Sequence, residues 1–240
     1  MRRETADGAE SGAPAAVDGA FFAAAAGPME FILVRHGESE GNAGGIFQGR
    51  AEYPLTEKGR AQASGRGRSL AGLPSCAEAS KVLLFSSPLG RAMETAELIA
   101  RGAGFGAPET AECLVELDVG EWTGRSWSEL RSASPETWAA FHSRSWAAVE
   151  SAESPEALYR RAVLAWTFLR DRGLASGARA VVAVSHGGFL QWLVRATFGC
   201  RSWFPLLPVH NCGVFRLKVE RAAPDRAFIA WASIDGAPDA

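Results

Sequence analysis

The chain has 240 residues, of which 47% are hydrophobic and 22% are charged, and its formal net charge at neutral pH is −2. A chain of this length and composition can bury one large hydrophobic core, and its charge gives no general attraction to nucleic acid or to anionic membranes. We therefore expect one globular domain, over residues 29–240, with neither a nucleic-acid nor a membrane partner.

The first 28 residues differ in composition from the rest of the chain. Residues 1–28 are rich in alanine and glycine and show no amphipathic period, which is typical of a disordered tail. Residues 21–27 resemble a signal-peptide core only superficially, because they follow an acidic stretch and the basic pair Arg2-Arg3 lies far upstream. Met29 directly precedes the first predicted strand, so we also consider residues 1–28 a possible start-site misassignment.

From Met29 onward, predicted strands and helices alternate along the chain. This alternation predicts a three-layer α/β/α sandwich with a mostly parallel central sheet. Helix starts are indicated by Thr56, followed by Glu57, and by the Ser86-Ser87-Pro88 sequence. The predicted strands are 31–34, 81–85, 110–114, 180–184, 213–219 and 227–233, and the predicted helices are 56–70, 89–101, 126–131, 136–149, 155–171 and 188–198.

Two of the predicted strands end in nearly the same sequence. Each is a short, apolar run rich in β-branched residues, typical of a buried parallel strand, and each leads to a His-Gly pair, at His36 and at His186. Ligands of open α/β sheets bind beyond the carboxyl ends of the strands, where free amide groups at helix starts attract anions. We therefore expect both histidines at one site, with a phosphate group as its ligand.

Several other classes of site are excluded by missing residues. The chain has no G-x-x-x-x-G-K-[ST] loop, and no cysteine is followed six residues later by arginine. Glycines 102, 104 and 106 follow a helix rather than a strand, so they indicate a flexible loop and not a dinucleotide site. The sequence shows no metal-ligand spacing, so we expect neither metal nor cofactor. The four cysteines lack regular spacing, which favours reduced thiols in a cytoplasmic protein.

Four sequence patches together resemble the histidine phosphatase superfamily, whose fold is phosphoglycerate mutase-like. The patches are residues 33–42, residues 48–50 with 54–62, residues 86–96, and residues 185–188. Between them, residues 112–124 are similar to the acid/base segment of the family. The resemblance covers nearly all of the chain from Met29 to about Val219, and it implies that residues 29–240 form a histidine phosphatase catalytic domain.

Phosphoryl transfer depends mainly on positioning and on charge neutralisation, and the residue types in the patches suit that chemistry. Arg35 and Arg91 supply guanidinium groups for the phosphoryl oxygens, and a protonated His186 supplies a further charged donor. His36 is the predicted nucleophile, and two neighbouring arginines would help to keep its imidazole neutral. Asn42 and the Gly187 amide are predicted to bind phosphate as well.

Three further phosphate-binding residues, Gln48, Gly49 and Arg50, are implied by the resemblance alone. The family position of the proton donor falls on Glu116, which we expect to protonate the leaving oxygen and then to activate water. Glu112 and Glu121 are nearby alternatives for that role.

The predicted reaction is the hydrolysis of a small phosphorylated metabolite without metal, through a phosphohistidine intermediate. Phosphoglycerate mutase is the alternative, although residues 116–150 have no Arg-Arg pair and no lysine lies between Lys81 and Lys218. A phosphate-binding protein without turnover is a third possibility, which is disfavoured because all five candidate catalytic residues are present, namely Arg35, His36, Arg91, Glu116 and His186. We interpret His142 and His210 as structural residues.

Four tryptophans gather in the segment that covers the active site in similar proteins. They fit either an apolar wall of the substrate pocket or part of the core, because aromatic side chains at such spacing serve both purposes. These tryptophans are residues 122, 127, 138 and 146.

Overall fold

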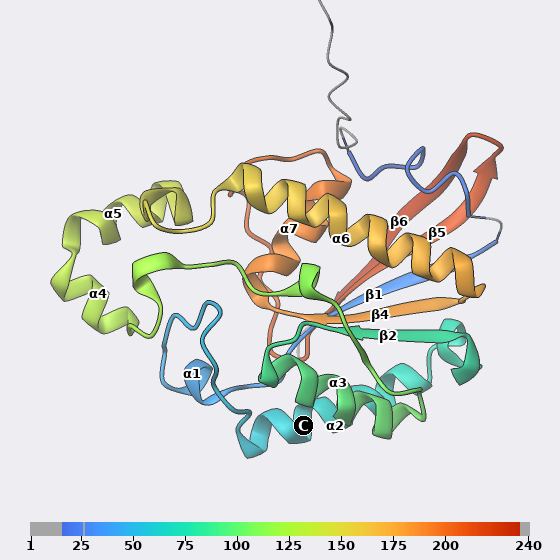
Figure 1. Ribbon diagram of the computed structural model, residues 1–240, viewed down its shortest axis with the longest axis horizontal. Coiled ribbons are helices and arrows are strands. Elements are labelled where there is room, and N and C mark those ends of the chain that lie inside the picture. The colour runs from blue at the N-terminus through green and yellow to red at the C-terminus, as the bar shows by residue number, and fades with distance from the viewer. Residues whose placement is uncertain (1–15, 26, 236–240) are drawn as a thin grey trace, which may run out of the picture.

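The computed structural model describes residues 16–25 and 27–235 (Figure 1). Its centre is a six-stranded sheet with the strand order β3-β2-β4-β1-β5-β6. The strands are β1 (Met29–Arg35), β2 (Val82–Ser86), β3 (Glu109–Thr110), β4 (Ala180–Ser185), β5 (Val214–Ala223) and β6 (Arg226–Asp235). The pairs β1–β4, β2–β4 and β2–β3 are parallel, and β5 and β6 extend the sheet as antiparallel strands.

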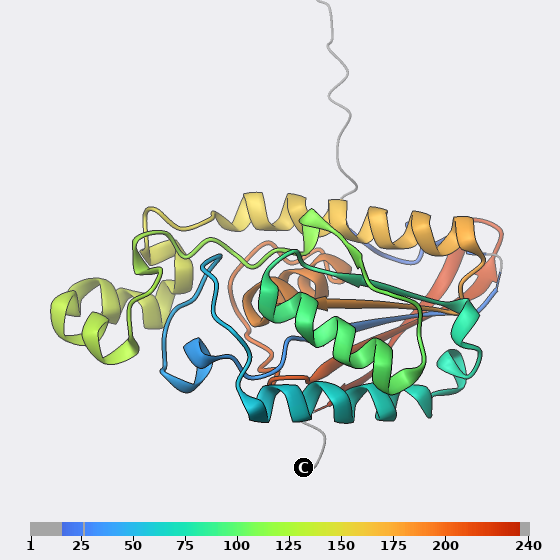
Figure 2. The same ribbon diagram turned by 60° about the horizontal axis from the view of Figure 1, so that its bottom comes forward.

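Helices cover both faces of this sheet, as the sequence predicts. Helices α2 (Glu57–Ala71) and α3 (Gly90–Ala103) lie on one face, and α6 (Pro155–Ser176) and α7 (Gly187–Thr197) lie on the other. Figure 2 shows α6 above the sheet and α2 and α3 below it. The fold is therefore a three-layer α/β/α sandwich with a mostly parallel sheet.

The central strands alternate between the two cores because successive side chains of a strand point to opposite faces. In β1, Phe31 and Leu33 pack with the helices α6 and α7, whereas Ile32 and Val34 pack with α2 and α3. All four side chains are fully buried. Burial on both faces explains why the strand reads as one continuous apolar run.

The remaining helices lie mainly in the connections. Figure 1 shows that α4 and α5 project beyond the carboxyl ends of β1, β2 and β4, on the side where α1 also lies. These helices are α1 (Glu40–Ala43), α4 (Trp127–Ala133) and α5 (Pro135–Arg144), and the 3-10 turns are η1 (Pro74–Cys76), η2 (Ala79–Lys81), η3 (Glu112–Leu114), η4 (Gly120–Trp122) and η5 (Ser145–Ala148).

The region predicted as a disordered tail is packed from residue 16 onward, which corrects that prediction for the described part. Val17 and Phe22 are fully buried, and the Phe22 ring lies 5.4 Å from the Phe31 ring and 5.8 Å from the Trp166 ring. The Val17 amide donates to the Ala196 carbonyl at 2.9 Å. The segment has no helical period because it packs as an irregular strap, held by a few large side chains. Residues 1–15 lie outside the described residues.

Two further findings concern the helices and the cysteines of the described chain. None of its helices has both the length and the apolar character needed to span a bilayer. The four cysteines are free thiols, and of these Cys76 and Cys212 are buried.

Candidate active site

The two strand-end histidines meet at the carboxyl edge of the sheet. Strands β1 and β4 are parallel neighbours, and their register pairs Arg35 with Ser185, so His36 and His186 follow at the same level. The His36 amide donates to the Ser185 carbonyl at 2.9 Å, and the two imidazole rings lie 5.1 Å apart. The predicted convergence is therefore present.

His36 is buried and held in one orientation. Its Nδ1 lies 2.7 Å from the Gly37 carbonyl oxygen, and because a carbonyl only accepts, Nδ1 carries the proton and Nε2 keeps its lone pair. Burial lowers the pKa of His36 well below its usual value, and the charges of Arg91 and Arg35 lower it further. The imidazole is thus neutral at neutral pH, as a nucleophile requires.

Two arginines flank the histidines, each anchored by backbone carbonyls. The Arg35 guanidinium donates to the Val209 carbonyl at 2.8 Å, and the Arg91 guanidinium donates at 2.7 Å to the carbonyls of Ala51 and Gly49. Burial lowers the pKa of both arginines, but a guanidinium titrates so high that both stay charged. Their Nε atoms are buried without a hydrogen-bond partner among the described residues, as is His186 Nδ1.

His186 differs from the prediction that it is protonated. Its Nε2 lies 2.8 Å from the Ser87 hydroxyl, and its side chain is fully buried. Burial lowers the pKa of His186 well below its usual value, and the neighbouring charges of Arg91 and Arg35 contribute in the same direction. With these neighbours His186 is neutral near pH 7, so it is a neutral hydrogen-bonding group and not a fixed cation.

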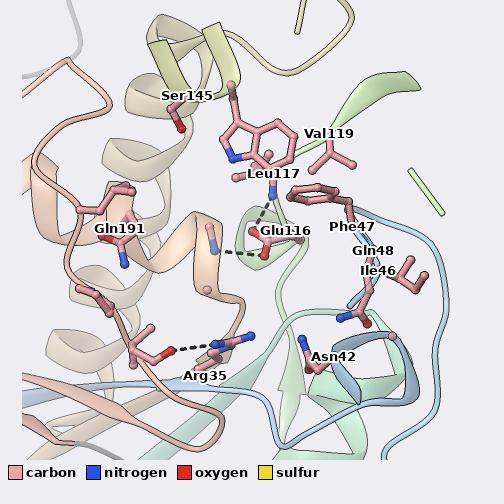
Figure 3. Close-up of a pocket in the computed structure, with 18 of the residues that line it drawn as sticks. Arg35, Asn42, Ile46, Phe47, Gln48, Glu116, Leu117, Val119, Ser145 and Gln191 are labelled. Carbon is pink, nitrogen blue, oxygen red and sulfur yellow. Dashed lines mark hydrogen bonds between the residues drawn. The ribbon is translucent and has the colours of Figure 1, made fainter. Parts of the chain in front are cut away.

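Glu116 lies against the start of α7. Its Oε1 accepts hydrogen bonds from the amides of Leu117 and Phe189, both at 2.8 Å, and its Oε2 accepts one from Gly188 at 3.1 Å. The approach requires glycine at 188, since a Cβ there would lie 2.2 Å from Leu117 Cδ2. Figure 3 shows Glu116 between Arg35 and Phe47 in the cavity. The alternatives Glu112 and Glu121 do not line it.

Asn42 and Gln48, which the sequence predicts to bind phosphate, both line the cavity. Asn42 Oδ1 accepts from the Ser39 amide at 3.1 Å and from Asn211 Nδ2 at 3.0 Å, and Figure 3 shows its amide nitrogen turned into the cavity. Gln48 Oε1 accepts from the Ser39 hydroxyl at 2.7 Å. Ser39 thus orients the side-chain amide groups of both Asn42 and Gln48.

The two predicted glycines also lie at the cavity, but Arg50 does not. A Cβ on Gly187 would lie 3.2 Å from Arg35 Nε, and Gly49 has a positive φ of 49° with Val119 close by. The Arg50 side chain turns outward, donating to the Glu116 carbonyl at 3.1 Å and to the Glu153 carboxylate at 3.0 Å. The predicted phosphate role of Arg50 is therefore replaced by a role in fixing the main chain at Glu116.

Two polar residues of the site were missed at the sequence level. Ser87 contacts His186, but its Ser-Ser-Pro sequence indicates only a helix start. Asn211 donates to the His36 carbonyl at 3.1 Å and to Asn42 Oδ1 at 3.0 Å. Asn211 lies in an irregular loop far along the chain, so no periodicity or motif could have indicated it.

These residues form one end of a cavity of about 840 Å³, whose other end is largely apolar. Trp127 and Trp146 line it, whereas Trp122 and Trp138 do not, so the tryptophan segment serves both as wall and as core. His142 and His210 line it as well. Within residues 16–25 and 27–235, no group of His, Cys, Asp and Glu side chains could hold a metal ion.

Comparison with known proteins gives consistent results. Residues 31–231 match the family described as the histidine phosphatase superfamily (branch 1). The glucosyl-3-phosphoglycerate phosphatase of Mycolicibacterium vanbaalenii is 32% identical over 188 residues, which cover 75% of this chain and 76% of that protein. The adenosylcobalamin/alpha-ribazole phosphatase of Salmonella typhimurium is 31% identical over 209 residues, which cover 86% of this chain and 90% of that protein.

A solved structure shows the same fold at lower sequence identity. The mycobacterial glucosyl-3-phosphoglycerate phosphatase in complex with VO3 superposes with a TM-score of 0.74 and 22% identity, covering 87% of this chain and all of that one.

Proposed function

Because this chain belongs to branch 1 of the histidine phosphatase superfamily, an enzyme superfamily, we propose that it hydrolyses small phosphate monoesters without metal, through a phosphohistidine on His36. The observation that carries the proposal is the orientation of His36. Its Nδ1 is bound to the Gly37 carbonyl, which leaves the Nε2 lone pair for attack on phosphorus.

In the first half-reaction, Nε2 of His36 attacks phosphorus, an N–P bond forms, and the ester P–O bond breaks. The departing oxygen takes a proton from Glu116. In the second half, Glu116 accepts a proton from water as the water attacks phosphorus, the N–P bond breaks, and phosphate leaves. His36 is then neutral again, and Glu116 again carries its proton.

The positive charge for this reaction comes from Arg35 and Arg91. Their Nε atoms and His186 Nδ1 are buried donors without partners among the described residues, which fits an arriving anion. A neutral His186 that accepts from Ser87 at Nε2 presents an N–H at Nδ1, so it can donate to a phosphoryl oxygen without carrying charge.

Glu116 suits the acid/base role because its carboxylate is fixed at the cavity wall. Oε1 accepts two backbone amides and Oε2 accepts one, so Oε2 keeps a position for the transferred proton. These hydrogen bonds hold the Glu116 carboxylate against the first residues of α7, which directly follow His186.

The alternative is a phosphoglycerate mutase. Its substrate carries a carboxylate as well as phosphate, and among residues 16–25 and 27–235 the arginines that line the cavity are Arg35 and Arg91. No lysine lines the cavity in the described part of the chain. This arrangement favours hydrolysis of a monoester over mutase activity. A cytoplasmic location and the lack of nucleic-acid and membrane partners stay predictions.

One experiment separates the alternatives. Purified enzyme in excess EDTA is assayed for phosphate release from a panel of alkyl, aryl and sugar phosphates, beside an assay of 2-/3-phosphoglycerate interconversion. We expect phosphate release that EDTA does not reduce and that vanadate inhibits. Interconversion faster than phosphate release would favour the mutase, and loss of activity in EDTA that a divalent ion restores would contradict metal independence.

A further inference from the structure

We propose that the apolar end of the cavity is a binding site for the alcohol part of the substrate, so that the enzyme prefers phosphomonoesters with one bulky aromatic or apolar group and no second anionic group. This inference rests on the proposed function, since it concerns the leaving group of the same reaction. The site, here called the aromatic subsite, is lined by Phe47, Trp127, Phe141, Trp146, Phe204 and Leu206.

One wall of the aromatic subsite is a cluster of rings around Phe47. The Phe47 ring centroid lies 4.3 Å from that of Trp127, 5.2 Å from that of Trp146 and 6.1 Å from that of Phe141. Behind them the buried Trp122 lies 5.3 Å from Phe47. Such contacts fix the rings against one another, so the wall is formed before any ligand binds.

This wall has a fixed position relative to the end of the cavity that contains Arg35, His36 and Arg91, here called the phosphate end. Phe47 is followed directly by Gln48 and by Gly49, whose carbonyl accepts from Arg91 at 2.7 Å. The Phe47 amide donates to the Arg125 carbonyl at 2.9 Å, and the Phe47 carbonyl accepts from the Gly124 amide at 2.8 Å. Arg91 therefore contacts the chain only two residues after Phe47, so a phosphate bound by Arg91 lies close to the aromatic wall.

A second part of the lining comes from the 203–209 segment, which is tied to α7. Gln191 donates to the Leu207 carbonyl and accepts from the Leu207 amide at 2.8 Å, and Arg195 donates to the Pro205 carbonyl at 2.5 Å. Phe204 and Leu206 line the cavity and are nevertheless 42% and 48% exposed. Partly exposed apolar side chains that line a cavity together with aromatic ones are typical of a site that buries an apolar ligand.

Charge distinguishes this subsite from a site for acidic substrates. Among the described lining residues, Arg35 and Arg91 are both at the phosphate end, and apart from His36 and Glu116 the remaining titratable side chains are those of His142 and His210. A carboxylate placed among these rings would lose water without gaining a guanidinium or ammonium partner from the described lining, which is costly. The relatives that act on phosphoglycerate derivatives therefore do not supply a model for the substrate of this chain.

The size of the cavity agrees with this assignment. About 840 Å³ is within the range that encloses a drug-sized ligand, and phosphate alone occupies only a small part of it.

The first test compares esters of matched leaving-group acidity: ethyl phosphate, 2-(1-naphthyl)ethyl phosphate and 3-carboxypropyl phosphate. We expect kcat/KM for the naphthylethyl ester to exceed that for the ethyl ester by about 100-fold, since burial of a bicyclic ring is worth about 3 kcal/mol. We expect the carboxypropyl ester to be no better than the ethyl ester. Equal values for all three, or the highest value for the carboxypropyl ester, would overturn the inference.

The second test removes part of the wall. Trp127→Ala should lower kcat/KM for the naphthylethyl ester about tenfold, mainly through KM, and leave the ethyl ester within twofold. Trp127 is 49% exposed, so the variant should fold. The matched control is Phe228→Ala, which removes a 59% exposed aromatic side chain of β6 away from the cavity and should change neither ester. Equal loss for both esters in Trp127→Ala would contradict a leaving-group subsite.

The third test does not depend on turnover. Isothermal titration calorimetry compares 2-(1-naphthyl)ethylphosphonate with 3-carboxypropylphosphonate as non-hydrolysable probes. We expect the naphthyl probe to bind more tightly, and Trp127→Ala to remove the difference. This result without hydrolysis of any ester would reject the proposed function and keep the subsite. Hydrolysis of the esters without a binding preference for the naphthyl probe would keep the function and reject the subsite. No binding of either probe together with no hydrolysis of any ester would reject both.

Discussion

The two ends of the cavity are built by different means. The phosphate end is formed at the carboxyl ends of β1, β2 and β4, and its His36, Arg91 and His186 are all buried. The aromatic subsite is formed by Phe47 in the connection between α1 and α2, by the α4–η5 region and by the 203–209 segment, and Trp127 is about half exposed. Figure 1 shows α4 and α5 projecting away from the sheet.

The difference follows from what each end must do. Phosphoryl transfer needs charges and a nucleophile at fixed distances, and a register-paired sheet edge supplies them with little freedom. Recognition of a leaving group needs apolar area but little angular precision. Helices α4 and α5, which project from the sheet, can supply that area. We therefore expect substitutions at the phosphate end to reduce the rate by orders of magnitude, and those at the aromatic subsite to change only the choice of substrate.

The largest expected effect is that of His36→Ala. Removing the proposed nucleophile should lower turnover by at least about 10⁴-fold and abolish acid-labile labelling of the protein by a phosphorylated substrate. Rapid acid quench with a radiolabelled ester measures the labelling, and a thermal melt controls for folding. Labelling that persists in this variant would show that another residue forms the intermediate.

Glu116→Gln is expected to have the next largest effect, and one that depends on the leaving group. For an alkyl ester, phosphoenzyme formation should slow by roughly 10²–10⁴-fold, whereas an aryl ester with a good leaving group should slow less. In this variant the glutamine NH₂ group replaces the oxygen that accepts from the Gly188 amide, so two donors meet and this hydrogen bond is lost. The free energy of unfolding should therefore fall by about 1 kcal/mol. Single-turnover rates with both esters decide the matter, and equal slowing would contradict the role of Glu116 as acid.

Phe22→Ala tests whether scaffold and chemistry are separable. Phe22 is buried against Phe31 and Trp166, so the variant should lose about 3–5 kcal/mol of unfolding free energy with kcat nearly unchanged. Urea unfolding measures the loss, and Phe228→Ala on the exposed face of β6 should cost far less. A Phe22→Ala variant as stable as the parent would show that residues 16–25 do not pack in solution.

The pH dependence of stability tests the buried histidines. Burial and the arginines lower the folded-state pKa of His36 and His186 well below 6.5, so below that pH the unfolded chain binds more protons. The unfolding free energy is therefore not reduced by these histidines above about pH 6.5, and it decreases as the pH falls below that value. His186→Asn should reduce the drop in unfolding free energy between pH 7.5 and 5 by up to about 2 kcal/mol. An unchanged drop, measured by urea titration, would contradict a lowered pKa of His186 in the folded protein.

The smallest expected effect is that of Arg50→Met. Arg50 is partly exposed and pairs with Glu153, which Arg161 also contacts at 2.8 Å, so stability should fall by less than about 1 kcal/mol. Inhibition by vanadate should stay within twofold, whereas Arg91→Met should weaken it strongly. A large loss of vanadate inhibition in Arg50→Met would restore the phosphate role that the sequence predicts.

Several elements were predictable because their signals are local. The strand through Phe31 and Ile32 is an unbroken apolar run, and Thr56 is the N-cap of α2, with its hydroxyl accepting from the Gly59 amide at 3.0 Å. The parallel sheet followed from the alternation of strands with helices. The convergence of His36 and His186 followed from the rule that strands of a parallel sheet end at one edge.

Other features depended on long-range packing. Phe22 was assigned to a disordered tail because its neighbours are small and aperiodic, yet it fills a space between β1 and α6. The outward turn of Arg50 depends on Glu153, about one hundred residues downstream.

The sequence by itself indicated five of the six strands and the helices on both faces of the sheet, because strand periodicity and caps act over a few residues; the predicted strand 110–114 is only Glu109–Thr110, since Glu112–Leu114 form the 3-10 turn η3. The candidates for nucleophile, phosphate-binding arginines and acid came from short motifs and from the family resemblance that those motifs carry. Only the tertiary structure decided that His186 is neutral, that Asn211 and Ser87 join the site, and that Trp127 lines the cavity while Trp138 packs behind it. Protonation, hydrogen-bond partners and burial are set by neighbours that lie far apart along the chain, and folding alone brings those neighbours together.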